Sequence, residues 1–306
     1  MAIVVFGSVN MDLVVRTSRA PEPGETLTGR TFHTAPGGKG ANQAVACARL
    51  GAATRFVGRV GADAFGAALR DGLRAAGVDI SGVATDDAAS SGVALITIDD
   101  AAENRIIVVP GANGTVGAED LARLDTALAD ANVLLLQLEI PLDAVREAAR
   151  LARGRGVTVV LDPAPARPLP RDLYGLVDIL TPNATEAAAL AGATVRDAAD
   201  AARAAHTLQG LGAARVVVKL GGAGVYWRDG VDEGSLPAYP TTIVDTVAAG
   251  DAFNGALAAA LDAGHDLGTA VRWGAAAGAL AVSKAGAQEA MPDRQALLAM
   301  LASNPG

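Results

Sequence analysis

Short apolar segments alternate with longer helical segments along most of this chain. The apolar segments are rich in valine, leucine and isoleucine, and each ends at a glycine, a proline or a polar residue. Such alternation with short connections predicts an α/β fold, in which a mostly parallel central sheet has helices on both faces. The predicted strands are Ile3–Phe6, Thr54–Gly58, Val133–Glu139, Val157–Asp162, Asp178–Thr181 and Val216–Leu220. The predicted helices include 63–76, 119–128, 142–153, 198–209, 252–263 and 275–281.

Two segments, 13–34 and 92–109, depart from this alternation. Each contains two runs of β-forming residues, and the first segment has a loop with two prolines and a glycine between its runs. We expect these runs to form a small β-sheet beside the main body, placed to act as a lid over a site. The four expected strands are Leu13–Val15, Leu27–Phe32, Gly92–Ile98 and Arg105–Val109.

Composition limits the class of protein. The 306 residues are 51% hydrophobic and carry a formal net charge of −8, so one ordered domain spanning 1–306 with a large core is expected. An acidic chain without a basic stripe argues against nucleic acid as a partner. The sequence has no long uninterrupted apolar run and no signal-like start, which predicts a cytoplasmic protein without a membrane span. The single cysteine, Cys47, is expected to be a small buried residue.

The segment 244–256 combines small residues with two aspartates, Asp245 and Asp251. A short β-type run, Thr241–Val244, precedes it, and a helical pattern starts near Ala249. A helix start presents free N–H groups and a positive dipole end, which suit phosphate oxygens. The carboxylate of Asp251, in the first turn, can accept a proton from an attacking hydroxyl. The alternative is that Asp251 only caps the helix.

Two polar stretches occur in the N-terminal half. A glycine-rich turn at 37–40 opens a helix to about Leu50, and Lys39 and Asn42 in it can donate hydrogen bonds to sugar oxygens. Asn10 and Asp12 follow the first strand and project to the same side of an extended segment. An ordinary helix entry and a polar turn are the alternatives. The turns match neither a P-loop nor the Gly-x-Gly-x-x-Gly of dinucleotide-binding enzymes.

The polar residues that follow the predicted strands fall into two groups. Ligands bind at the carboxyl ends of strands in open α/β sheets, so each group marks a candidate site. We interpret the first group as a sugar site and the second as a nucleotide and catalytic site. The first group is Asn10, Asp12, Gly38, Lys39, Asn42 and Glu139. The second group is Asn183, Glu186, Lys219, Gly221, Gly224 and Asp251.

Over nearly its whole length the chain resembles the ribokinase (phosphofructokinase-B) family of sugar kinases. The resemblance implies a ribokinase-like fold and an enzyme that uses ATP and Mg²⁺ to phosphorylate the O5 hydroxyl of D-ribose, giving D-ribose 5-phosphate and ADP. The runs that carry it are 7–12, 37–44, 137–139, 163–167, 181–186, 245–256 and 286–288.

The resemblance also implies a role for individual residues. Asp251 is the expected base, and the N–H groups of Ala248, Ala249 and Gly250 form the expected anion hole. The first group above, together with Asp251, is expected to hold ribose. Asn183 is expected to contact ATP phosphate, and Glu186 to organise Mg²⁺ through water. The residues expected to border the nucleotide are Lys219, Gly221, Gly222, Gly224 and Gly250.

The family has a loop for a monovalent cation, so potassium is the expected activator. The ligands implied for this chain, mostly backbone carbonyls, are Asp245, Val247, Ala281, Lys284 and Gly286. The family also predicts a homodimer through the small sheet. The chain departs from the family pattern at three positions, where Lys219 and Ala252 replace threonine and Ala290 replaces a serine.

Two other functions are compatible with the resemblance. One is a kinase of the same family for another sugar or nucleoside, such as deoxyribose, fructose or adenosine. The other is a sugar-binding regulator without catalysis. The few aromatic residues argue against a nucleoside base, and the intact pair Gly250–Asp251 argues against a protein that only binds.

Overall fold

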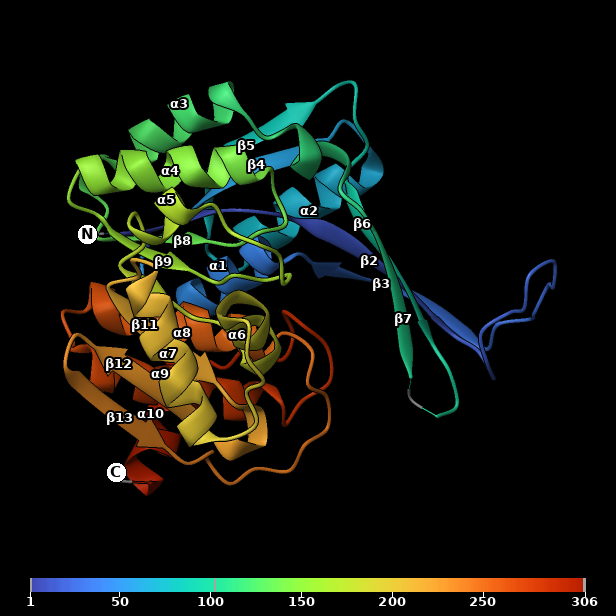
Figure 1. Cartoon of the computed structure of the whole chain (residues 1–306). Helices are drawn as coiled ribbons and strands as arrows, with labels where there is room; N and C mark the ends of the chain where they lie inside the picture. Colours follow the sequence, from blue (N-terminus) through green and yellow to red (C-terminus); the bar gives the residue numbers. More distant parts are fainter. Residues whose placement is uncertain (1, 102, 305–306) are drawn as a thin grey trace.

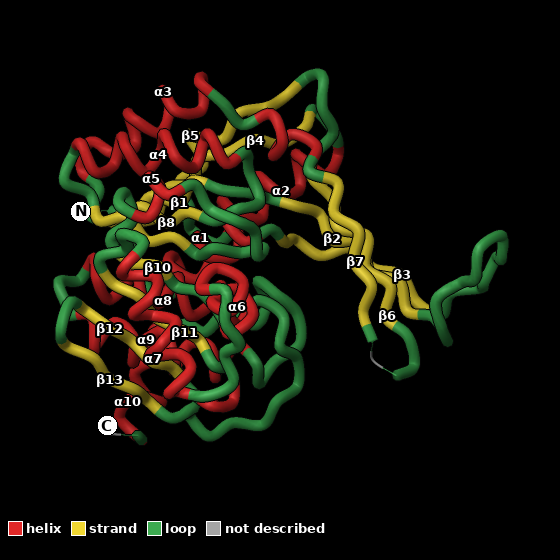
Figure 2. The backbone as a smooth tube through the Cα atoms, in the orientation of Figure 1, coloured by secondary structure: helices red, strands yellow, loops and turns green. Residues whose placement is uncertain are grey.

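A computed structural model describes residues 2–101 and 103–304. Within these residues a nine-stranded sheet forms the centre, in the order β13-β12-β11-β10-β9-β8-β1-β4-β5 (Figures 1 and 2). Neighbouring strands from β5 across to β11 are parallel, and β12 and β13 add an antiparallel edge. The strands are β1 Ile3–Phe6, β4 Thr54–Gly61, β5 Asp79–Asp86, β8 Val133–Leu136, β9 Thr158–Leu161, β10 Ile179–Leu180, β11 Arg215–Lys219, β12 Val225–Asp229 and β13 Asp232–Leu236.

Helices cover both faces of this sheet, which confirms the predicted α/β class. Side chains alternate along each strand, so Ile3 and Val5 enter one core and Val4 and Phe6 enter the other. Helices on the first face are α1 Lys39–Arg49, α2 Ala64–Ala75, α8 Ala249–Asp262, α9 Leu267–Ala281 and α10 Arg294–Ser303. Helices on the second face are α3 Ala118–Ala127, α4 Leu142–Gly154, α5 Arg171–Tyr174, α6 Ala184–Ala191 and α7 Ala198–Gly210.

A second, smaller sheet projects from the body, in the order β3-β2-β6-β7 (Figure 1). Strands β2 and β6 are parallel, and the other two pairs are antiparallel. The predicted hairpin of the second segment is confirmed as β6 and β7. The strands are β2 Asn10–Arg16, β3 Thr31–Gly37, β6 Gly92–Ile98 and β7 Asn104–Val109.

Two predicted strands are wrong. Residues 27–30 are not in a strand; β3 starts at Thr31 and continues through Gly37, because its partner β2 begins at Asn10 and Asn10 pairs with Gly37. The run Thr241–Val244 is not a strand either. The N–H of Val244 instead donates to the carbonyl oxygen of Val282 at 2.8 Å. Val244 is therefore bonded to the residue after α9 and not to a strand.

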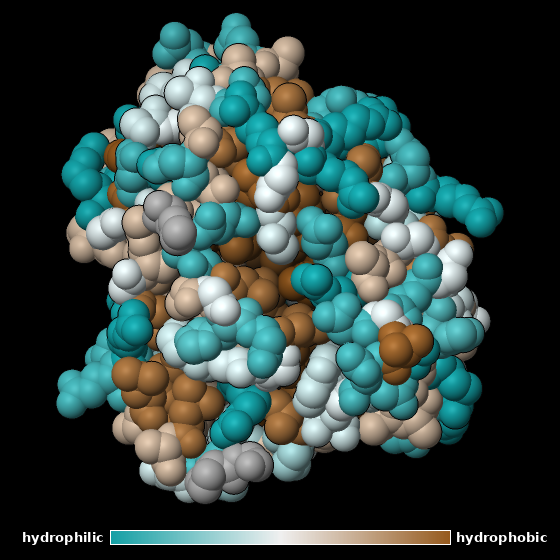
Figure 3. All heavy atoms as spheres, turned by 90° about the vertical axis from the view of Figure 1, so that its left-hand side faces the viewer, coloured by the Kyte–Doolittle hydropathy of each residue, from teal (hydrophilic) through white to brown (hydrophobic). Residues whose placement is uncertain are grey.

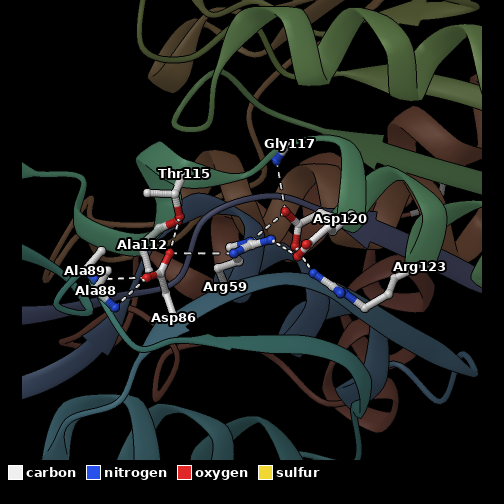
Figure 4. A network of polar contacts seen from close by, with 10 residues as sticks. Arg59, Asp86, Ala88, Ala89, Ala112, Thr115, Gly117, Asp120 and Arg123 are labelled. Carbon is white, nitrogen blue, oxygen red and sulfur yellow. Dashed lines mark hydrogen bonds and ion pairs between the residues drawn. The ribbon is translucent and has the colours of Figure 1, made fainter.

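An ion-pair cluster fixes the base of the small sheet to the body (Figure 4). Arg59, on β4, donates to the fully buried carboxylate of Asp120 at 2.7 Å and lies 3.6 Å from Asp86. Asp86 ends β5, just before β6, and accepts a hydrogen bond from the hydroxyl of Thr115 at 2.6 Å. Since Thr115 lies in the 3₁₀ turn Gly111–Thr115 after β7, the cluster holds both ends of the β6–β7 hairpin.

The surface on the side opposite the small sheet carries both hydrophilic and hydrophobic side chains. It shows hydrophilic side chains around a central hydrophobic area (Figure 3). Among the described helices, none is both long and apolar enough to cross a membrane. Cys47 is buried in the core under α8, as predicted for a small structural residue.

Candidate active site

The site lies where the strand order of the main sheet changes direction. Strands β4 and β5 continue on one side of β1, whereas β8 and the following strands lie on the other. A crevice forms at the carboxyl ends of strands at such a point. There the hydroxyl of Ser8 donates to Glu139 Oε2 at 2.5 Å, and the backbone N–H of Lys39 donates to the same oxygen at 2.9 Å. The first turn of α1 therefore joins the ends of β1 and β8.

The glycines before α1 are needed for this close contact. Gly38 has φ 89°, and a Cβ on it would lie 2.8 Å from the backbone nitrogen of Asn10. A Cβ on Gly40 would lie 2.8 Å from the nitrogen of Ser8. Because such distances are too short for real atoms, glycine here lets the helix start directly against the turn between β1 and β2.

Asp251 lies in the first turn of α8, which begins at Ala249 as predicted. Among the described residues other than glycine, Ala248 alone has a positive φ, at 57°. Such a conformation is unfavourable for alanine and occurs mainly where function requires it. It sets the turn from which Ala249 and Gly250 begin the helix, whose first N–H groups suit an anion.

The carboxylate of Asp251 is buried and oriented by two amides of α1. Asn42 Nδ2 donates to Asp251 Oδ2 at 3.0 Å, and Gln43 Nε2 donates to Asp251 Oδ1 at 3.1 Å. Burial raises the pKa of this carboxyl, and the positive charge of Lys39 opposes the rise. Both oxygens are thus directed towards α1, and this geometry favours a site residue over a simple helix cap.

Lys39 is the positive charge at the centre of the site. Burial lowers its pKa, but four surrounding carboxylates raise it by more, so its pKa lies above the ordinary range for lysine. Lys39 is therefore protonated at neutral pH and neutralises part of this acidic environment. The four carboxylates are those of Asp251, Asp162, Glu139 and Glu186.

A buried amide that sequence reasoning missed, Asn113, orients Asn10. Asn113 Nδ2 donates to Asn10 Oδ1 at 2.7 Å, and the side chain of Asn113 also bonds to the N–H and the carbonyl of Val9, each at 3.0 Å. Asn10 Oδ1 is therefore occupied, so the Asn10 amide offers its N–H groups to a ligand. Asn113 lies in the 3₁₀ turn after β7, an antiparallel strand of the small sheet, so the rule for the ends of parallel strands did not identify it.

Asp12 has a raised pKa. Burial is the main cause, and the neighbouring charges of Glu139 and Glu289 add to it, so that the pKa of Asp12 is about 7. Asp12 lies next to Gly37, where a Cβ would come within 2.4 Å of its Oδ2. A carboxyl with this pKa changes its charge in the physiological range.

The nucleotide group of predicted residues borders a cleft of about 700 Å³. Asn183 and Glu186 form a capping box at the start of α6: Glu186 Oε2 accepts from the Asn183 N–H at 2.7 Å and Glu186 Oε1 accepts from Asn183 Nδ2 at 2.9 Å. Burial is the main cause of a raised pKa at Glu186. The predicted residues that line the cleft are Lys39, Asn183, Glu186, Lys219, Gly221, Gly222, Gly224, Ala248, Ala249, Gly250 and Asp251.

The other predicted sugar residues do not line the cleft itself, but Gly38, Asn42 and Glu139 connect to residues that do. Asn42 bonds to Asp251, and Glu139 bonds to the backbone of Lys39. Gly38 caps α1 directly before Lys39. The structure therefore brings the two groups together at Lys39 and Asp251, where the first turns of α1 and α8 meet.

Lys219 has a partner that the sequence interpretation did not assign. Its Nζ donates to Asp162 Oδ1 at 2.9 Å. A Cβ built on Gly250 would lie 3.5 Å from the same Nζ, so the Lys219 ammonium group is next to the start of α8. Asp162 ends a predicted strand, so its position at the carboxyl end of β9 was a signal that the sequence contained.

The two halves of the expected cation loop lie side by side. Asp245 Oδ1 accepts from the N–H of Val247 at 3.0 Å, and Asp245 Oδ2 accepts from the N–H of Gly286 at 3.1 Å. The carbonyl of Ala281 accepts from the N–H of Lys284 at 3.1 Å. The five residues predicted for this loop are therefore close in space.

A buried carboxylate, the positive end of a helix and two lysines beside a glycine-walled cleft are parts that suit phosphoryl transfer. The fold and the site together define a phosphotransferase of the α/β class. Comparison with known proteins agrees: residues 2–294 match the model of the pfkB family carbohydrate kinases. The chain belongs to this family.

Known relatives match over nearly the full chain. The ribokinase of Haemophilus influenzae is 39% identical over 299 residues, which cover 98% of each chain. The deoxyribokinase of Salmonella typhi is 34% identical over 293 residues, 95% of this chain and 96% of that protein. Among solved structures, that of Arabidopsis thaliana ribokinase in complex with ribose and ATP is 35% identical, covers 98% of each chain and has a TM-score of 0.92.

Proposed function

We propose that this protein is an ATP-dependent ribokinase, which transfers a phosphoryl group to the O5 hydroxyl of D-ribose. The observation that carries the proposal is the position of Asp251. Its buried carboxylate lies in the first turn of α8, bonded to Asn42 of the predicted sugar group, and borders the cleft that holds the predicted nucleotide group. The ribokinase relatives, and the ribose and ATP bound to the Arabidopsis enzyme, support the choice of substrates.

The proposed reaction is a direct transfer. The O5 oxygen of ribose attacks the γ-phosphorus of ATP, a bond between O5 and phosphorus forms, and the bond from phosphorus to the β–γ bridging oxygen breaks. The O5 proton passes to the carboxylate of Asp251, and ADP leaves with the electron pair of the broken bond. N–H groups at Ala248, Ala249 and Gly250 stabilise the charge on the transferred phosphoryl group. Products are ribose 5-phosphate and ADP.

The residues of the cleft fit a nucleotide with Mg²⁺. Glycines 221, 222 and 224 let a flat base and ribose approach the backbone, and Lys39 and Lys219 offset phosphate charge. When bound, Mg²⁺ neutralises charge on the phosphates. In the part of the chain that the structure describes, no three acidic, histidine or cysteine side chains form a metal cage. Glu186, which lines the cleft, would help to hold a Mg²⁺ through water.

Potassium activation is the second part of the proposal. Asp245 joins the two loop segments, 245–247 and 281–286, whose carbonyl groups are the expected ligands. Since Asp245 is only a few residues before Ala248, an ion bound here supports the conformation of the anion hole. Ala290 supplies no hydroxyl, so the site depends on backbone oxygens and Asp245.

A coupled ADP-release assay tests the proposed function. The panel contains ribose, deoxyribose, fructose, adenosine and no sugar, each with ATP and Mg²⁺, with potassium or with tetramethylammonium at equal ionic strength. We expect turnover with ribose above all others, increased by potassium. Higher turnover with deoxyribose would assign the protein to the activity of its Salmonella typhi relative. No turnover with any of them would favour the sugar-binding regulator.

Ribose binding is expected to weaken below neutral pH because of Asp12. The pKa of this carboxyl is about 7, and its ionised form is the better acceptor for sugar hydroxyl groups. Affinity should therefore be constant above pH 7 and fall by about ten-fold per pH unit well below it. Calorimetric titration of the protein with ribose, repeated at about every whole pH value from pH 5 to pH 9, measures this affinity.

The matched variant for this test is Asp12→Asn, which has the same shape and no ionisation. It should bind ribose more weakly than wild type above pH 7, with a flat profile. A wild-type profile that is flat over the same range, or a variant that keeps the slope, would remove Asp12 as its source.

We also propose that the protein forms a homodimer through the small sheet. The chain is proposed to be one domain of residues 1–306, with the small sheet as its lid. The register places Leu13, Leu95 and Ile107 side by side on one face, whereas Asn10 and Asp12 point to the opposite face. Leu95 is 42% exposed and Ile107 is 64% exposed. An exposed apolar face of this kind is typical of a contact surface. Other exposed apolar residues of the sheet are Phe32, Ile106, Val108 and Val109.

The wild-type protein is therefore expected to sediment as a dimer at micromolar concentration. Ile107→Lys places a charge in the proposed contact and should give a monomer, because an unpaired buried charge is costly. Arg74→Glu, on the exposed surface of α2, is the matched control and should stay dimeric. A wild-type monomer in analytical ultracentrifugation would contradict the dimer.

We further propose that the enzyme is cytoplasmic, where ATP is available.

A further inference from the structure

Gln43 joins two carboxylates of the site through a single amide group. Its Nε2 donates to Asp251 Oδ1 at 3.1 Å and to Asp162 Oδ2 at 3.0 Å. All three side chains are buried, with Gln43 fully excluded from solvent. An amide nitrogen has two N–H groups, so both are used in this arrangement. Gln43 lies in the run that carries the family resemblance, and no role follows for it from the proposed reaction.

The orientation of this amide is fixed by charge. An ionised carboxylate can only accept hydrogen bonds, so the Gln43 nitrogen must face Asp162 and Asp251, and its oxygen must face away. There Gln43 Oε1 accepts from Gln137 Nε2 at 2.7 Å. Gln137 follows β8, is buried, and packs against Gly7, where a Cβ would lie 2.1 Å from Gln137 Oε1. Two amides in series thus hold one rotamer of Gln43.

The row continues to the nucleotide side of the cleft. The second oxygen of Asp162 accepts from Lys219 Nζ, and this ammonium group lies beside Gly250 at the start of α8. One hydrogen-bonded row therefore runs from Lys219 through Asp162 and Gln43 to Asp251. The ammonium group at one end borders the phosphates expected in the cleft, and the carboxylate at the other end is the expected base.

We propose that Gln43 is a positioning residue for phosphoryl transfer. It sets the carboxylate of Asp251 and, through Asp162, the ammonium group of Lys219 at a fixed distance from each other. The acceptor of the sugar proton and a cation for the phosphate are thereby placed together before the substrates bind. The inference rests on the proposed function, because it assigns Gln43 a role in that reaction. It adds no covalent step, and the Gln43 amide neither gains nor loses a proton.

The test begins with Gln43→Met, which keeps the length of the side chain and removes both N–H groups. We expect kcat to fall by about 100-fold, because small misplacements of reacting groups have effects of this size. KM values for ribose and ATP should change little, since Gln43 is fully buried and does not line the cleft. Gln137→Met leaves Gln43 in place but removes the donor to its oxygen, and it should lower kcat in the same direction by a smaller factor.

A double-mutant cycle separates positioning from a general loss of packing. If Gln43 links Lys219 to Asp251, the loss of kcat in Lys219→Met should be smaller in the Gln43→Met background than in wild type. Effects that multiply to within about two-fold would show independent residues and overturn the proposal. An unchanged kcat in both Gln43→Met and Gln137→Met would also overturn it.

Two controls keep the result interpretable. Ribose and ATP binding by calorimetry shows whether each variant is folded. If Gln43→Met does not fold, Gln137→Met and its cycle with Lys219→Met carry the test alone. A wild-type protein that phosphorylates no sugar contradicts the proposed function itself, whereas an active wild type with fully active variants contradicts only the role of Gln43.

Discussion

Asp251→Asn is expected to lower kcat by about 10²–10⁴-fold, the usual contribution of a general base. The substitution keeps the shape of the side chain but removes the carboxylate that is proposed to accept the O5 proton. Asn42 and Gln43 each donate a hydrogen bond to one oxygen of this carboxylate. In the asparagine variant an NH₂ group replaces one of these oxygens, so it faces another NH₂ group and that hydrogen bond is lost. Binding of ribose should be retained, because the remaining sugar residues are unchanged.

Two measurements check this expectation, single-turnover kinetics for the chemical step and calorimetry for ribose binding. The matched control is Asp262→Asn on the same helix, where the carboxylate accepts from Asn132 at 2.8 Å, far from the cleft residues. This control should keep wild-type kcat. If Asp251→Asn retained near-normal turnover, another group would have to accept the proton, and Asp251 would be left as a structural residue of α8.

The parallel core of the fold was predictable because its signal is local. Runs such as Ile3–Phe6 and Val133–Leu136 are apolar on both faces, as expected for a strand buried between two helix layers. The antiparallel edge β12–β13 and the strand β5 were not predicted. Each of these strands is only partly buried, and β13 has no fully buried residue, so their signal in sequence is weaker.

The boundaries of the small sheet depended on pairing and not on composition. Leu27–Phe32 has β-forming residues, yet the strand begins at Thr31 and includes Pro36 and Gly37. Its limits follow from β2, because each residue of β3 pairs with one of β2 from Asn10 to Arg16. A sequence alone does not show which partner sets the register.

The candidate site was predictable where charged or glycine residues follow strands, and less so for neutral amides. Position along the chain assigned Lys39 and Glu139 to the sugar group and Asp251 to the nucleotide and catalytic group. Asn113 and Gln43 contribute through hydrogen bonds to residues about a hundred or more positions away, such as Asn10 and Asp251. The importance of such an amide depends on its partners, which are visible only after folding.

The second large effect is expected for Lys39→Met. Lys39 faces four carboxylates, including Asp251 and Asp162, and its positive charge lowers the pKa that burial raises at Asp251. Its removal also takes away the proposed donor to the sugar and a positive charge that borders the cleft. We expect kcat/KM for ribose to fall by about 10²–10³-fold, comparable to the loss of a donor that stabilises charge in a transition state.

The pH dependence of kcat separates the electrostatic part of this effect. Asp251 must be ionised to accept the O5 proton, so kcat decreases as pH falls through the pKa of this carboxyl. Without Lys39 the pKa of Asp251 rises further, and the acid limb of the profile should move to higher pH. Saturating ribose and ATP remove the contribution of Asp12, because kcat then reports the ternary complex.

Lys39→Arg is the matched variant, because it keeps the positive charge and changes the geometry. Its acid limb should stay near that of wild type even where KM for ribose rises. A limb at the same pH in Lys39→Met and in wild type would show that Lys39 does not act on the base, and would restrict Lys39 to holding the sugar. A limb shifted equally in both variants would assign the effect to geometry and not to charge.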